Sequence, residues 1–447
     1  MLSKLLTIGV LIACSALGVR MTMFLGFHNG LMGVIGNALS SPALQTPTSS
    51  TTTVSAVPFP AGPQLFVISY TGLGPIDRLL GDVIAYFTLL MHTPQNWPAR
   101  AAWTYIMFQF YGIWQAVQLE GYRLGNANRA IRHTAILGVI FQVASLTFTL
   151  PIYLIIHILT DPSVTVPGSL RVPRADRVAA PLAGFLSFTL PAMGMGLPGF
   201  LETPTYHYVS ALWQVFPVTQ TVWHRLCRQI FRLEGADSGV NTVPMHVEEI
   251  EVSEQFEATG DAIKVEKEII TATSSNITTK APASPTHFSM SQGLPTAYSD
   301  AFFQGIVSHV TLLTLVLLPP GTPGLPPVLR HLATQFTFST VFTPFTFRTS
   351  PVIESSMLEN YAAGASIQGP LLGALALSFL QWDLFFSSVA YLTWVVYDSS
   401  KASKENKKNP GFLRILCEVL VWTLLGGPAA AGAVMLSKRD KGHLALA

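Results

Sequence analysis

Apolar segments long enough to cross a lipid bilayer recur along this chain, and they restrict its fold more than any other feature. A helix needs about 20 mostly apolar residues to span the hydrocarbon core. Because lipid offers the backbone no hydrogen bonds, such segments must be helical. We expect spans at 79–93, 101–121, 134–159, 179–201, 206–223, 302–319, 370–397 and 411–435.

The N-terminal segment is a further candidate. Lys4 precedes a run of apolar and small residues that reaches Val19, which is typical of a cleaved signal peptide or of a first transmembrane helix. We favour the uncleaved helix, because little ectodomain would follow it apart from a Ser-, Thr- and Pro-rich loop predicted at 40–60. The expected fold class is all-α, a polytopic transmembrane helical bundle of roughly eight or nine spans.

Charged residues are sparse and unevenly placed. They make up 11% of the chain, against about 25% in soluble globular proteins. Residues 234–300 hold 11 of the 24 acidic residues, and their polar composition predicts a disordered insert. A glycosylation motif begins at Asn276 within it. The insert divides one transmembrane domain into two helical halves, 1–233 and 301–447.

This composition excludes an ordinary soluble enzyme, and a net charge of +2 provides no basic face for a nucleic acid. The basic residues give no orientation in the membrane. Clusters at 401–408 and 438–441 flank the predicted span 411–435, so both cannot lie on the cytoplasmic side if that helix crosses. The Phe/Thr-alternating segment 334–347 is too short to span and predicts a re-entrant or interfacial loop, with a pair of strands as the alternative.

Ionisable groups at membrane depth are costly and commonly functional. Asp383 lies near the middle of the predicted span 370–397, with Ser387 one helical turn later. Burial among aromatic residues would favour its protonated form, so that it could act as an acid. The alternative is an aspartate whose hydrogen bonds are satisfied by polar groups of another helix.

Other carboxylates mark the ends of predicted spans. Glu120 is followed by Arg123 one turn later, which indicates either a binding or catalytic pair or a snorkelling pair at the membrane boundary. Glu202 follows a Gly- and Pro-broken stretch of the kind that lines cavities. Asp77 and Asp82 flank an arginine at the entry to the span 79–93; they could form a tuned proton donor or a salt bridge that faces the headgroups.

Intramembrane carboxylates, abundant aromatic residues and the absence of a metal-binding motif favour one reaction class. An acid protonates an alkene or epoxide of a lipid-soluble polyene, and the resulting carbocation cyclises. Burial keeps the proton potent and keeps water away from the cation, while aromatic faces stabilise the positive charge. This chemistry requires neither a metal nor another cofactor.

Three stretches carry a resemblance to a known group: WQAVQLEGYRLGN (114–126), GLPGFLETPTYHYVSALWQVFP (196–217) and LQWDLFFSSVAYLTWVVYD (380–398). The chain resembles the fungal membrane-bound terpene cyclases of meroterpenoid pathways, such as those for ascofuranone-type and macrophorin-type compounds. It is not obviously similar to the smaller seven-helix cyclases typified by the pyripyropene cyclase.

The resemblance implies a cofactor-free cyclase of fungal secondary metabolism, with an isomerase- or lyase-like reaction, in the membrane of the endoplasmic reticulum. Its partners would be membrane lipids and a lipid-soluble, prenylated small molecule. Acid and partner roles carry over first to Asp383 and Glu120, and then to Glu202, Asp77 and Asp82. Substrate contacts are expected from Arg123, Trp114, Trp213, Gln214, His207, Gln381, Trp382, Tyr391 and Trp394.

Two other functions fit the composition. A transporter or efflux protein for a hydrophobic metabolite would need two conformations and preferably symmetric halves, and no internal repeat relates the two halves of this sequence. A non-catalytic membrane scaffold would use the acidic insert as a docking segment.

Overall fold

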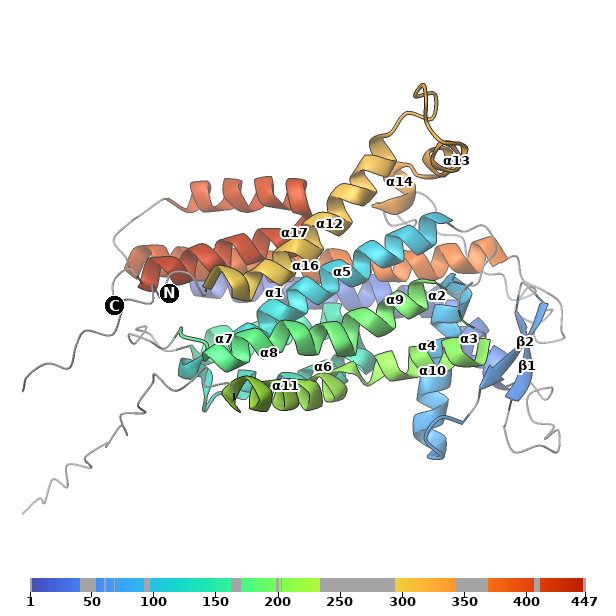
Figure 1. The fold of residues 1–447 in the computed structure, drawn as a ribbon, viewed down its shortest axis with the longest axis horizontal. Helices are drawn as coiled ribbons and strands as arrows, with labels where there is room; N and C mark the ends of the chain where they lie inside the picture. The colour runs from blue at the N-terminus through green and yellow to red at the C-terminus, as the bar shows by residue number, and fades with distance from the viewer. Residues whose placement is uncertain are drawn as a thin grey trace, which may run out of the picture.

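Long helices form an elongated bundle, and the first helix begins at the same end of it at which the last helix ends (Figure 1). The computed structural model describes residues 2–40, 54–59, 62–67, 69–91, 97–161, 170–197, 201, 203–233, 294–342, 369–405 and 411–444. In these ranges the regular structure is helical apart from one β-hairpin. The predicted helical fold class is therefore confirmed.

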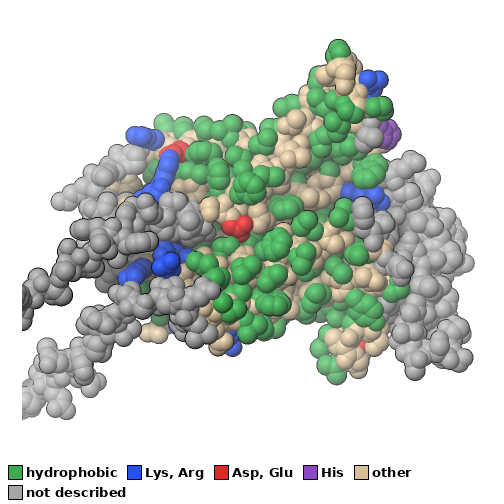
Figure 2. All heavy atoms as spheres, viewed as in Figure 1, with side chains coloured by type: hydrophobic (Ala, Val, Ile, Leu, Met, Phe, Trp, Pro, Cys, Tyr) green, Lys and Arg blue, Asp and Glu red, His purple; other side chains and the backbone are tan. Residues whose placement is uncertain are grey.

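Apolar side chains cover the sides of the bundle, whereas Lys and Arg gather mainly toward one end of the face in Figure 2. Phe303, Leu413 and Leu424 are each more than 60% exposed. An apolar surface of this extent indicates that the sides of the bundle face lipid. Within the described ranges, five segments are long and apolar enough to cross a membrane, so the predicted count of eight or nine is not confirmed: Ser3–His28, Arg174–Gly196, Tyr298–Leu317, Gly373–Lys404 and Phe412–Lys441.

The first half of the chain contains most of the short elements. Strands β1 (Val54–Phe59) and β2 (Gly62–Val67) pair antiparallel, which differs from the irregular loop predicted at 40–60. The helices are α1 (Leu2–Val19), η1 (Arg20–Phe24), α2 (Leu25–His28), α3 (Leu31–Ser40), α4 (Gly74–Met91), α5 (Trp97–Gly121), η3 (Leu124–Asn126), η4 (Ala130–Arg132), α6 (Thr134–Ala144), α7 (Leu146–Thr160), α8 (Arg174–Gly184), η5 (Phe185–Thr189), α9 (Leu190–Gly196), α10 (Thr203–Gln214) and α11 (Phe216–Leu233).

The second half contains the longest helices. They are α12 (Leu294–Leu317), α13 (Pro327–Gln335), α14 (Phe338–Val341), α16 (Gly369–Glu405) and α17 (Phe412–Leu444). Residues 294–300, which the sequence assigned to the disordered insert, are already part of α12. The rest of the insert, with the predicted glycosylation site Asn276, lies outside the described residues. Of the predicted re-entrant segment 334–347, residues 334–342 contain the end of α13 and the single turn α14.

Helices α6 and α7 form a hairpin, although the sequence predicted one continuous span at 134–159. The chain reverses at Ser145, whose φ is 65°. The reversal brings α7 back to the segment that precedes α6, where the Tyr153 hydroxyl donates to the Ile131 carbonyl at 3.1 Å. With 11 residues, α6 rises only about 16 Å, which is about half of a hydrocarbon core.

Helix α17 also folds back on itself, so the predicted single crossing at 411–435 is not what the structure shows. Gly427 has φ 78° and ψ 175°, outside the helical region, and Pro428 follows it. Lys438 forms an ion pair with Glu418, 20 residues earlier. That contact requires the segments 412–426 and 428–444 to lie antiparallel, as the two red helices in Figure 1 do.

Both reversals expose backbone N–H groups inside the bundle, and buried polar side chains bind them. The Asp383 carboxylate accepts hydrogen bonds from the Thr147 amide at 2.7 Å and from the Ser145 hydroxyl at 3.2 Å. At the other turn, Gln109 Oε1 accepts from the Ala429 amide at 3.0 Å. Since the first amides of a helix have no partner within it, each side chain satisfies a group that would otherwise be buried and unpaired.

The α17 reversal explains the basic clusters that gave no orientation. Lys401 and Lys404 lie near the end of α16, and Lys438 and Lys441 lie near the end of α17. Because the chain between them turns back rather than crossing, these four lysines lie at the same end of the bundle. In a membrane, the positive-inside rule predicts that this end faces the cytoplasm.

We therefore expect cysteines placed at Lys404 and at Lys441 to be labelled from the same side of sealed microsomes by a membrane-impermeant maleimide. The background would carry Ser at the three native cysteines, and each site would also be tested after permeabilisation. Labelling from opposite sides would show that α17 crosses the membrane and would contradict the hairpin.

Candidate active site

A cavity of about 200 Å³ lies in the apolar side of the bundle and is partly open to the surface. It lies between α5, the α8–η5–α9 segment and α12. Four aromatic residues form much of its wall: Trp103, Phe108, Tyr111 and Phe188. Aliphatic and small residues complete the apolar lining: Met107, Ala192, Met193, Gly196 and Leu197.

Three polar atoms of lining residues have no hydrogen-bond partner among the described residues. They are Trp103 Nε1, Thr189 Oγ1 and Gln304 Oε1. All three side chains are more than 90% buried. An unpaired buried polar atom costs about 1–3 kcal/mol, so a bound molecule with its own donors and acceptors would offset this cost. Apolar walls with a few polar atoms are typical of small-molecule sites.

A carboxyl group is hydrogen-bonded to two of the residues that line this cavity. Asp300 is half-buried on the second turn of α12. Its Oδ2 accepts from the Tyr111 hydroxyl at 2.6 Å, and its Oδ1 accepts from Gln304 Nε2 at 2.9 Å. Gln115, one turn after Tyr111 on α5, donates to the Tyr111 oxygen at 2.7 Å. Tyr111 and Gln304 both line the cavity.

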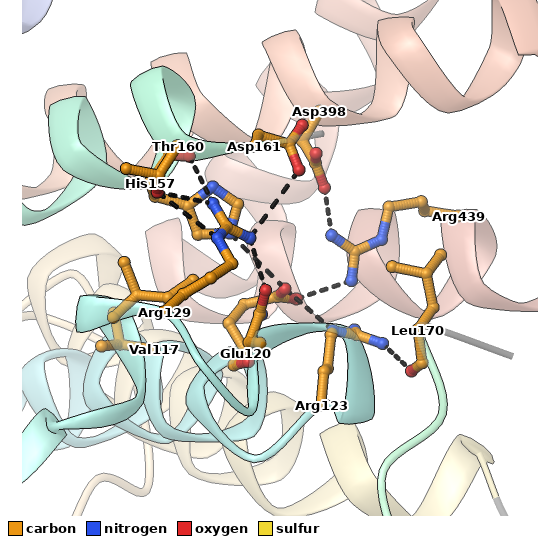
Figure 3. Close-up of polar contacts among 12 residues, drawn as sticks. Val117, Glu120, Arg123, Arg129, His157, Thr160, Asp161, Leu170, Asp398 and Arg439 are labelled. Atoms are coloured by element: carbon orange, nitrogen blue, oxygen red, sulfur yellow. Dashed lines mark hydrogen bonds and ion pairs between the residues drawn. The ribbon is translucent and has the colours of Figure 1, made fainter. Parts of the chain in front are cut away.

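Glu120 belongs to an ionic cluster at the end of the bundle that carries the basic residues (Figure 3). Its two oxygens pair with different arginines, Arg439 Nη2 at 2.6 Å and Arg123 Nε at 2.8 Å. All three side chains are at most 2% exposed. Two guanidinium groups stabilise the ionised carboxylate, so Glu120 lies in surroundings that suit an ion pair and not a proton donor.

The ionic cluster ties the ends of four helices together. Arg123 also pairs with Asp440 at 2.8 Å, and Arg439 also pairs with Asp398. Tyr298 on α12 accepts from Arg123 at 2.6 Å and donates to Asp440 at 3.2 Å. The cluster therefore joins α5, α12, α16 and the end of α17. Arg439 and Asp440 come from a segment that looks like an exposed basic tail in the sequence.

Asp383 lies away from this cluster. On α16 it is 15 residues before Asp398, which corresponds to about 22 Å along a helix. Ser387, Tyr391, Trp394 and Asp398 follow it on the same helical face. The structure therefore does not bring Asp383 and Glu120 together, and neither of them lines the cavity.

The remaining predicted acids lie elsewhere. Asp77 closes the loop before α4 by accepting from the amides of Tyr70, Thr71 and Gly72 at 3.1, 2.7 and 3.0 Å. Burial alone would raise the pKa of the Asp77 carboxyl, but these bonds and those from the Thr71 and Ser69 hydroxyls lower it to about 2. Asp82 is half-buried on α4. Glu202 is outside the described residues.

The predicted substrate-contact residues divide between several places. Trp213 lies behind the cavity wall, with its ring 5.4 Å from that of Phe188. Trp114 donates to Gln220 at 2.8 Å, and Gln381 donates to the Val341 carbonyl at 2.6 Å. The others are buried. Arg123 lies just after α5, and the rest lie on α10 or α16: His207, Gln214, Trp382, Tyr391 and Trp394.

The sequence reasoning missed the cavity residues and Asp300. Trp103, Met107 and Tyr111 recur every four residues, which places them on one face of α5 and could have indicated a lining. Asp300 was counted with the acidic insert, because nothing in its local sequence shows that α12 begins before it. The contact of Tyr111 with Asp300 joins residues 189 positions apart, so no local pattern predicts it.

Comparisons with known proteins give one family and two relatives. A family model described as the CtvD domain matches residues 7–443. The chain is 28% identical over 172 residues to a protein named terpene cyclase ascI from Acremonium egyptiacum, covering 36% of this chain and 41% of the relative. It is 26% identical over 231 residues to terpene cyclase ctvD from Aspergillus terreus, covering 50% and 60%. No solved structure matches.

For the ionic cluster, we expect Glu120→Gln to lower the Tm of the detergent-solubilised protein by about 5 °C or more. Removing one partner of a buried ion pair leaves the other charge uncompensated and costs about 3–5 kcal/mol. The matched control is Glu418→Gln, which breaks the more exposed pair with Lys438 and should cost about 1 kcal/mol at most. Equal Tm values for the two variants would contradict a structural role of the cluster.

For Asp77, we expect a pH-dependent contribution to stability. Its pKa is lower in the folded protein, about 2, than in an unfolded chain, about 3.9. The contribution is therefore complete above about pH 4 and is lost as the pH falls toward 2. Asp77→Asn should lower the Tm at pH 7 and should show a smaller further loss between pH 4 and pH 2.5 than the parent protein. A parallel loss in both proteins would assign the acid sensitivity to other groups.

Proposed function

Because the chain belongs to the CtvD-domain family, we propose that it is a membrane-bound terpene cyclase. The substrate would be a prenylated molecule, and the reaction would begin with protonation of an epoxide or alkene. The single observation that carries this proposal is the aromatic-lined cavity in the lipid-facing side of the bundle. The curated relatives are named terpene cyclases, and the chain spans about 41% and 60% of their lengths.

The position of the cavity suits a substrate dissolved in the bilayer. Two of its apolar lining residues, Met193 and Leu197, are also exposed at the surface of the bundle, so an isoprenoid chain could enter from lipid without crossing water. The enclosed volume of about 200 Å³ is smaller than the roughly 300–1,000 Å³ usual for ligand pockets. Since the cavity is open on one side, the rest of the substrate would lie along the surface of the bundle.

The lining suits a carbocation. The rings of Trp103, Phe108, Tyr111 and Phe188 line the cavity, and the π faces of aromatic rings attract positive charge. The apolar wall keeps water from quenching the cation before a ring closes. Once an acid has generated the cation, the substrate supplies the remaining electrons from its own double bonds or oxygen atoms, so the proposed reaction is a cofactor-free isomerisation.

The family resemblance also supports a pathway and a compartment for the enzyme. We place the enzyme in fungal secondary metabolism, on meroterpenoid substrates, in the membrane of the endoplasmic reticulum. A transporter for the same compounds would move them without changing their structure, which the experiment below distinguishes.

We expect microsomes that contain the protein to convert an epoxyfarnesyl phenol into a product of equal mass and different retention time in liquid chromatography–mass spectrometry. Ala192→Phe, which places a ring in the cavity, should lower the rate at least tenfold. The matched control, Leu190→Phe, changes a 52% exposed residue two positions earlier and should stay within twofold of the parent.

The parent, the cavity variant and microsomes without the protein would be compared at equal protein content. No conversion by the parent protein would overturn the proposed activity for these substrates. Uptake of unchanged substrate into proteoliposomes, without conversion, would instead favour a transporter.

A further inference from the structure

Asp300 has hydrogen-bond partners that suit a carboxyl group in either protonation state. When it is ionised, it accepts from the Tyr111 hydroxyl and from Gln304. When it is protonated, it can donate to the Tyr111 oxygen, because the Tyr111 hydrogen has a second acceptor in the Pro181 carbonyl at 3.3 Å. Gaining or losing a proton therefore leaves no group of this set unpaired.

No described residue forms an ion pair with Asp300. This differs from the ionic cluster, where Glu120 is bound by two arginines. A nearby cation stabilises the ionised carboxylate, which then carries no proton to give to a substrate. Asp300 has no such partner among the described residues, and it lies near the start of the apolar segment Tyr298–Leu317.

Asp383 has a different structural role from Asp300. It accepts hydrogen bonds from the Thr147 amide in the first turn of α7 and from the Ser145 hydroxyl. It is 3% exposed. None of the three acids is itself a lining residue of the cavity, and only Asp300 bonds directly to two residues that are, Tyr111 and Gln304.

We propose that the cavity between α5, α9 and α12 binds the isoprenoid chain of the substrate and that Asp300, bonded to two residues of its wall, is the acid that starts cyclisation. This inference rests on the proposed function. Tyr111 and Gln304 are positioning residues that hold the carboxyl group beside the cavity. The unpaired Gln304 Oε1 would accept from a hydroxyl of the substrate.

The proposed step balances without a further reactant. The Asp300 proton passes to the epoxide oxygen, and one C–O bond breaks with its electron pair retained by that oxygen as a hydroxyl. The tertiary carbocation that results is attacked by the electron pair of a double bond or oxygen of the same molecule, which closes the ring. The final cation loses one proton, which returns to the Asp300 carboxylate directly or through water. The acid is thereby regenerated, and the product contains the same atoms as the substrate.

The test compares Asp300→Asn, Asp300→Glu and Tyr111→Phe with the parent protein in the microsomal assay. General acid catalysis contributes about 10²–10⁴-fold, so Asp300→Asn should lose at least 100-fold in kcat. Asp300→Glu keeps the acid and should retain more activity than Asp300→Asn. Tyr111→Phe should lower kcat and change its pH profile, since the carboxyl loses a hydrogen-bond donor.

Folding and substrate binding are measured alongside. Each variant should keep its Tm within about 3 °C of the parent and should still bind the epoxide substrate, as measured by protection of a photoreactive prenyl probe. Glu418→Gln serves as the carboxylate control and should keep full activity. If the parent protein is active and Asp300→Asn is equally active, this inference fails while the cyclase proposal stands. If the parent produces no cyclised product, the proposed function itself fails.

A loss of activity that follows a loss of Tm in Asp300→Asn would be resolved by Asp300→Glu. Restored Tm together with restored turnover supports the acid role. Restored Tm without turnover, at unchanged probe binding, would show that the carboxyl group matters for folding alone and would overturn the inference.

Discussion

Backbone amides that lie inside an apolar bundle must find hydrogen-bond partners, and the arrangement of this protein depends on how that requirement is met at two chain reversals. Asp383 binds the amide at the start of α7, and Gln109 binds the amide that follows the α17 reversal. Each of these hydrogen bonds lets the chain turn back within the bundle, where lipid could not bond to the backbone amides that the turn leaves unpaired.

The carboxyl groups of the ionic cluster and the carboxyl group beside the cavity have different kinds of partner. In the cluster, Glu120, Asp398 and Asp440 are all paired with arginines, which joins the ends of the helices. At the cavity, Asp300 is held by a hydroxyl and a side-chain amide, and no described residue forms an ion pair with it. Because burial is costly for unpaired charge, the paired carboxylates stabilise the bundle, and they lie apart from the carboxyl group that we propose as the acid.

The sequence identified polar residues that are buried in this protein, but it did not show which of them lie close together. It selected Asp383, Glu120 and Arg123 because charge at membrane depth is costly, and all three are buried and bonded to other helices. Burial by itself does not distinguish a helix cap or an ion pair from an acid. That distinction depends on the hydrogen-bond partners, which are distant in the sequence. Asp383 is bound by the Thr147 amide, more than 200 positions away, and Glu120 is bound by Arg439, more than 300 positions away.

The sequence alone determined the helical class and the apolar exterior. The length and hydropathy of a segment are local properties, and they decide whether that segment is stable as a helix in lipid. It also indicated the cyclase resemblance. Only the tertiary structure decided that 134–159 and 411–435 fold back, since Ser145 and Gly427 can reverse a chain only where another helix binds the freed amides. It alone joined Asp300 to Tyr111, because α5 and α12 meet through packing that neither segment encodes separately.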